Sequence, residues 1–140
     1  MPAPPTVVDA SVVVKWILPE PSRPEALRLL QHYQGEAIRL FAPASLISEI
    51  CNTFCKRVRR GAMSAPAANE AYELLKLYSP VLVDDRDLMD EAMTLALTTG
   101  QALYDCLYLA LAQRQSCNLI TADEKFHAAV RKAFPNVLQL

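Results

Sequence analysis

Three aspartates stand where a folded chain could bring carboxylates together. Asp9 directly follows the β-rich run TVV, and Asp123 follows the run NLITA. Asp105 is the third residue of LYDCLYLALAQ, a segment that is otherwise apolar almost all round and contains no basic residue. An ionised carboxylate taken out of water is costly unless something compensates its charge. The compensating charge for Asp105 must therefore come from outside its own segment.

Clustered carboxylates favour the binding of a divalent cation. Two unit charges about 4 Å apart, at an effective dielectric constant near 20, repel each other by about 4 kcal/mol. Such acids either take up protons or bind cations. Carboxylate oxygens suit Mg²⁺ or Mn²⁺, which keep several waters and accept phosphate oxygens as further ligands. A cation of this kind would explain why Asp105 is tolerated.

Alternating strand and helix signals predict an α/β fold that places these acids together. Strands are expected at residues 6–9, 38–43, 80–85 and 118–121, and helices at residues 10–18, 25–34, 45–61, 64–78, 87–99, 102–115 and 123–134. This alternation predicts a largely parallel sheet with helices on both faces. Ligand crevices in such sheets lie outside the carboxyl ends of the strands. Asp9 and Asp123 can share that crevice, and Asp105 approaches it from the preceding helix.

Some acids also have a purely structural interpretation. Asp9 and Asp123 can each cap the helix that follows it. Glu49 lies away from the apolar stripe of its helix, so periodicity alone predicts a solvated surface acid. The residue pattern leaves both interpretations open for the two caps.

Composition predicts a single domain, residues 1–140, that needs no metal or disulfide to fold. About half of the 140 residues are hydrophobic, which is enough for one compact core. With 14 basic and 15 acidic side chains, the net charge is too small to attract nucleic acid or membrane globally. The four cysteines lack CxxC pairs, so reduced and mostly buried thiols are expected, Cys51 and Cys55 included. Asp9 and Lys15 interrupt the N-terminal apolar run too soon for a membrane span or a signal peptide, which predicts a cytoplasmic protein.

Four blocks of the sequence, taken together, resemble one protein family. They are VVDASVVVKWILPEP, APASLISEICNTFCKRVRRG, ALYDCLYLALAQ and LITADEKF. In this order they resemble the PIN domain, most closely the VapC-type toxins of bacterial toxin–antitoxin pairs, over nearly the whole chain. The resemblance implies a three-layer α/β sandwich with a central, largely parallel sheet and a metal-dependent endoribonuclease. It also implies Mg²⁺ (or Mn²⁺), an RNA substrate, a cognate antitoxin of the VapB type and a homodimer.

The resemblance also assigns roles to individual residues. Its acidic quartet falls on Asp9, Glu49, Asp105 and Asp123. The three aspartates are expected to ligate the metal directly or through water, and the glutamate to ligate it or to position the attacking water. Ser11 and Thr121 match hydroxyls that orient the metal ligands or a phosphate oxygen without ligating the metal themselves. Cys106 stands where such sequences commonly have a small residue, which affects local packing.

The residues expected to bind the RNA substrate belong to or lie near the densest basic run, KRVRR, residues 56–60. Lys56 shares a helical face with Glu49 and Asn52, so Asn52, Lys56 and Arg57 are expected to contact the RNA backbone. The alternative is a basic helix C-terminus that complements the helix dipole. Lys15 and Arg86 are weaker candidates for the same contact.

Other functions remain open at this stage. Within the family, the alternatives are an RNA-processing nuclease that is not a toxin and a non-catalytic interaction module. A phospho-accepting receiver domain lacks support, because no adjacent acid pair follows the first strand and no lysine follows the last. With three glycines, the chain has neither GxGxxG nor a P-loop to bind a nucleotide.

Overall fold

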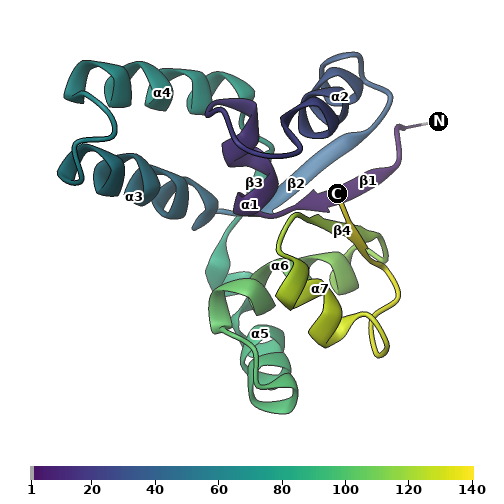
Figure 1. Ribbon diagram of the computed structural model, residues 1–140. Coiled ribbons are helices and arrows are strands. Elements are labelled where there is room, and N and C mark those ends of the chain that lie inside the picture. The colour runs from purple at the N-terminus through teal and green to yellow at the C-terminus, as the bar shows by residue number, and fades with distance from the viewer. Residues whose placement is uncertain (1) are drawn as a thin grey trace.

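A five-stranded parallel sheet forms the centre of the computed structural model, which describes residues 2–140 (Figure 1). Its strands are β1 (Pro5–Val8), β2 (Arg39–Pro43), β3 (Val81–Val83), β4 (Asn118–Thr121) and β5 (Val137–Gln139). The spatial order is β3-β2-β1-β4-β5, and every neighbouring pair is parallel. The chain therefore builds outward from β1 on one side through β2 and β3, and on the other side through β4 and β5. The order reverses between β1 and β4.

Helices connect the strands and cover the sheet. They are α1 (Ala10–Val13), the 3₁₀ helix η1 (Val14–Trp16), α2 (Arg23–Gln34), α3 (Leu46–Arg59), α4 (Ala65–Tyr78), α5 (Asp85–Thr99), α6 (Leu103–Arg114) and α7 (Glu124–Val130). Helix α6 packs against β1, β2 and β4 and is buried from Cys106 to Ala112. Helices α3 and α4 form a hairpin that projects from one side of the sheet (Figure 1). The predicted α/β sandwich with a parallel sheet is confirmed.

Local sequence signals account for several helix ends. Helix α4 begins after Ser64, whose hydroxyl accepts a hydrogen bond from the Ala67 backbone N–H at 3.2 Å. Helices α3 and α5 are followed by Gly61 and Gly100, which have φ angles of 74° and 73°. A residue with a side chain is rarely stable at such angles, so these glycines allow the chain to leave each helix. No helix of residues 2–140 has the length and apolar character needed to cross a membrane.

Four expectations from the sequence need correction. The helix expected over residues 10–18 is one α-helical turn followed by a 3₁₀ turn, because the chain must turn before Pro19. The helix expected over residues 123–134 ends at Val130, since the chain then returns to the sheet edge as β5. That three-residue strand was not predicted. Cys55 is exposed rather than buried, because it lies at the margin of the apolar stripe of α3.

Candidate active site

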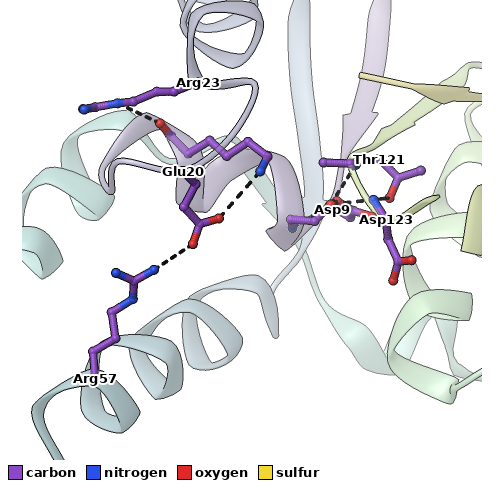
Figure 2. A network of polar contacts seen from close by, with 9 residues as sticks. Asp9, Glu20, Arg23, Arg57, Thr121 and Asp123 are labelled. Atoms are coloured by element: carbon purple, nitrogen blue, oxygen red, sulfur yellow. Dashed lines mark hydrogen bonds and ion pairs between the residues drawn. The ribbon is translucent and has the colours of Figure 1, made fainter. Parts of the chain in front are cut away.

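The point where the strand order reverses brings Asp9 beside the end of β4. The Asp9 backbone N–H donates to the Ile120 carbonyl at 3.3 Å, so the ends of the two strands are joined. Asp9 also caps α1, because its Oδ1 accepts from the Ser11 backbone N–H at 3.1 Å. The side chain is only 6% exposed. Figure 2 shows Asp9 next to Thr121 and Asp123.

Two hydroxyls connect the loops behind these acids. The Ser11 hydroxyl donates to Asp9 Oδ1 and accepts from the Ala122 backbone N–H at 2.8 Å. Thr121 is fully buried, and its Oγ1 lies 3.4 Å from Ser11 Oγ and accepts from the Asp123 backbone N–H at 3.0 Å. Ser11 and Thr121 therefore lie beside Asp9, where the ends of β1 and β4 meet.

The other two aspartates lie on either side of β4 in the chain. Asp123 caps α7 through Oδ1, which accepts from the Phe126 backbone N–H at 3.0 Å, and its side chain is exposed. Asp105 lies in the first turn of α6 and is half-buried. Burial and the nearby charge of Asp123 raise the pKa of Asp105 above its ordinary value. These two acids are thus close enough to repel each other.

Glu49 is not the solvated surface acid that periodicity predicts. It is half-buried on α3, and its Oε1 accepts a hydrogen bond from the Tyr108 hydroxyl at 3.0 Å. Burial raises the pKa of Glu49 from 4.5 to about 7, against the opposing effect of this hydrogen bond. The charges of Asp105 and Asp9 contribute to the same rise. Glu49 therefore belongs to the same electrostatic cluster as the aspartates.

Burial is also the main cause of the raised pKa of Asp9. Burial raises the pKa of Asp9 from 3.8 to about 6, although the hydroxyls of Ser11 and Thr121 oppose the rise. The charge of Asp105 raises this pKa as well. Two acids of the cluster thus have pKa values near neutrality, a property that is common at functional sites.

The donor set fits a hard divalent cation. The four acids supply only carboxylate oxygens, and none of them forms an ion pair within residues 2–140. In the same residues, no three acidic, histidine or cysteine side chains are grouped closely enough to hold a metal ion as they stand. Ligation therefore requires rotation of these side chains or bridging waters, and Mg²⁺ commonly retains several waters.

A groove of about 550 Å³ runs along α3 from the acidic cluster. Its lining residues are Ser45, Ser48, Glu49, Asn52, Thr53, Lys56 and Tyr104. The structure thus brings together three residues that the sequence predicts to act on RNA, Glu49, Asn52 and Lys56.

Arg57 faces away from this groove. Its Nη2 lies 2.9 Å from Glu20 Oε2, and the Nζ of the buried Lys15 lies 3.6 Å from Glu20 Oε1 (Figure 2). Arg23 donates to the Lys15 carbonyl at 3.1 Å in the same network. Arg57 therefore anchors α3 to the segment between η1 and α2, and Lys15 holds Glu20 from η1, which gives both a structural role.

Sequence reasoning missed three residues beside the site: Asp85, Tyr104 and Tyr108. Asp85 accepts from the Ser45 backbone N–H at 3.1 Å and contributes to the raised pKa of Glu49. A signal for it was present, because Asp85 is the second residue after β3, close to the strand end as Asp9 is to the end of β1. Tyr104 directly precedes Asp105 and Tyr108 follows it three residues later. Their apolar surroundings gave no sign of which tyrosine would be exposed.

Comparison with known proteins gives consistent matches. The family model described as PIN domain matches residues 6–132. Ribonuclease VapC3 of Pyrobaculum aerophilum is 32% identical over 130 residues, covering 89% of this chain and 96% of the relative. The crystal structure of PAE2754 from Pyrobaculum aerophilum superimposes with a TM-score of 0.73 at 21% identity, covering 98% and 91% of the two chains. VapC20 of Mycobacterium tuberculosis, described as a toxin that cleaves the sarcin–ricin loop, gives 0.60 at 19% identity, covering 89% and 94%.

Proposed function

Since this chain belongs to the PIN domain family, we propose that it is a metal-dependent endoribonuclease that hydrolyses RNA phosphodiester bonds. One observation carries the proposal: Asp9, Glu49, Asp105 and Asp123 form one repelling cluster at the carboxyl ends of β1 and β4, with no basic ion-pair partner in residues 2–140. The name of the relative Ribonuclease VapC3 supports ribonuclease activity.

In this proposal the three aspartates hold Mg²⁺ or Mn²⁺, directly or through water. Asp9 and Asp123 each use Oδ1 to cap a helix, which leaves Oδ2 for the cation. Ser11 fixes the orientation of Asp9, and Thr121 binds the backbone N–H of Asp123. The bound cation supplies positive charge to the phosphoryl oxygens and lowers the pKa of water for attack.

Glu49 is assigned the role of positioning the water molecule that attacks the phosphodiester bond. The Tyr108 hydroxyl binds its Oε1, so its Oε2 remains available to orient a water molecule. A carboxylate whose pKa is about 7 can also accept a proton from that water near neutral pH. Asn52 and Lys56 extend from the same helix face to bind the RNA backbone, and Arg57 acts behind them by holding α3 to Glu20.

The direct test is metal-dependent cleavage of RNA by the purified protein. Mn²⁺ should produce defined RNA ends that chelation abolishes. Asp105→Asn should remove this cleavage, because a neutral amide is a poor ligand for such a cation. Asp90→Asn, the same change at an exposed position of α5, is the matched control and should cleave like the original protein. Cleavage by Asp105→Asn at an undiminished rate would refute the assignment.

We further propose that the enzyme is the toxin of a VapBC-type pair and acts in the cytoplasm as a single-domain homodimer restrained by a VapB-type antitoxin. The description of VapC20 as a toxin supports this finer function. Expression of the chain alone should arrest growth, and Asp105→Asn should relieve the arrest. Unimpeded growth despite RNA cleavage in vitro would instead favour an RNA-processing nuclease.

A further inference from the structure

Tyr104 is an exposed aromatic side chain that lines the groove. It is 61% exposed, whereas the next turns of α6, from Cys106 to Ala112, are buried. Its neighbour in the chain, Asp105, belongs to the acidic cluster. The other groove residues come from α3 and from Ser45 directly before it, and most are small or polar. Tyr104 therefore offers the groove an aromatic surface that packs little within the chain.

We propose that Tyr104 is the platform on which an unpaired base of the RNA substrate stacks beside the scissile bond. The inference rests on the proposed ribonuclease function and adds the substrate class to it. Proteins that bind single-stranded nucleic acid combine a basic group that follows the backbone with an aromatic ring under a base. Here Lys56 of α3 supplies the charge and Tyr104 of α6 the ring, and both line one groove.

The spacing along α3 fits a short single strand. Glu49 and Lys56 are seven residues apart, which corresponds to about 10.5 Å along a helix axis. Stacked nucleotides rise by about 3.4 Å each along a strand, so this length spans roughly three nucleotides. Glu49 would then lie at the cleaved bond and Lys56 at a phosphate further along the strand. Between them, Asn52 and Thr53 offer polar groups to sugar and base edges, and Ser48 does so beside Glu49.

This arrangement selects RNA whose bases are already unpaired. In an A-form duplex the base faces are stacked on each other and are closed to a side chain. A tyrosine ring can accept any base from a loop, bulge or single-stranded end, because every base has a π-face. The groove therefore selects unpaired over paired RNA. Recognition of the base itself depends on the polar groups of α3.

Cleavage kinetics with a single-stranded RNA test the platform. Loss of one stacking contact should lower kcat/KM for Tyr104→Ala by about 5- to 150-fold, mainly through a higher KM. Tyr104→Phe keeps the ring and should remain close to the original protein. Tyr72→Ala removes another exposed tyrosine, located on α4 outside the groove, and should change nothing. An unchanged KM for Tyr104→Ala would overturn the inference.

Fluorescence gives a readout that does not depend on catalysis. The chain has one tryptophan, Trp16, which is 2% exposed and lies outside the groove. In Tyr104→Trp the introduced indole should be quenched when a single-stranded oligonucleotide binds in chelating buffer. A duplex of the same sequence should quench it much less. Binding of the single strand without quenching would show that the ring contacts no base.

The two proposals fail in different ways. If the original protein makes no metal-dependent cut in RNA, the ribonuclease function fails and the platform with it. If the original protein cleaves RNA and Tyr104→Ala matches it in KM, only the platform fails. A Tyr104→Ala variant that cleaves normally but loses a protein partner would assign the ring to that partner and overturn the inference as well.

Discussion

Replacing Asp9 by asparagine is expected to stabilise the metal-free protein at neutral and alkaline pH. Burial raises the pKa of Asp9 from 3.8 to about 6, so the folded protein resists ionisation of this carboxyl. Asparagine has nearly the same shape and caps helices as well as aspartate does. Its amide oxygen can still accept from the Ser11 backbone N–H and hydroxyl. The substitution thus removes the charge and keeps the cap.

The sign and size of the effect follow from the raised pKa. Well below pH 3.8 the carboxyl is protonated in both folded and unfolded chains, and its ionisation has no effect on stability. Between about pH 4 and 6 the unfolded chain loses its proton first, so the free energy of unfolding falls as the pH rises. Each tenfold change in proton affinity is worth about 1.4 kcal/mol, so a pKa rise from 3.8 to about 6 corresponds to about 3 kcal/mol. Allowing about 1 kcal/mol for an unsatisfied amide N–H, Asp9→Asn should gain about 2 kcal/mol above pH 7.

Urea denaturation in chelating buffer at pH 4 and pH 8 measures this gain. The buried Trp16, whose indole N–H donates to the Ala26 carbonyl at 2.8 Å, reports unfolding by its fluorescence. Asp84→Asn is the matched control, because Asp84 also caps a helix after a strand but is exposed. Arg86 lowers the pKa of Asp84, so this control should gain no stability at pH 8. Equal pH dependence of the original protein and Asp9→Asn would refute the reasoning.

Two further predictions concern the metal and the basic run of α3. Mn²⁺ at about 100 times its dissociation constant should raise the free energy of unfolding by about 2.7 kcal/mol. Asp105→Asn should abolish this gain. An unchanged melting temperature at millimolar metal would contradict the metal site. Lys56→Ala should weaken RNA binding and reduce its salt dependence by a slope of about one, with stability unchanged. Arg57→Ala should instead lower the free energy of unfolding by up to about 1 kcal/mol, because the ion pair with Glu20 is lost. If the Arg57 variant changed the salt dependence of RNA binding more than the Lys56 variant, the two roles would be reversed.

The sheet and the strand-end acids could be predicted because their signals are local. Short β-rich runs alternate with amphipathic segments, and Asp9 and Asp123 stand directly behind two of those runs. A parallel sheet brings such positions to one edge whatever the remaining sequence is. The strand β5 could not be predicted in this way, because its three residues form a strand only by pairing with β4.

The environment of Glu49 and the role of Arg57 depend on residues far away in the chain. Tyr108, which binds Glu49, is 59 positions away, and Glu20, which pairs with Arg57, is 37 positions away. Helical periodicity describes only the residue's own helix, so it could not show that Tyr108 of α6 contacts Glu49 on α3. The same limit explains why the basic run seemed to be one surface, whereas the structure divides it between a groove and an ion-pair network.

The capping and functional interpretations of Asp9 and Asp123 are compatible. Each carboxylate uses Oδ1 for the cap, so its second oxygen is not needed to hold the helix end. The cap restricts the rotation of the side chain, so less conformational entropy is lost when the second oxygen binds a cation. Asp105 has no such cap to form, and its raised pKa reflects burial and repulsion by Asp123. A cation in the cluster would relieve that repulsion and the burial cost of Asp9 together, so metal binding and fold stability should rise together in this protein.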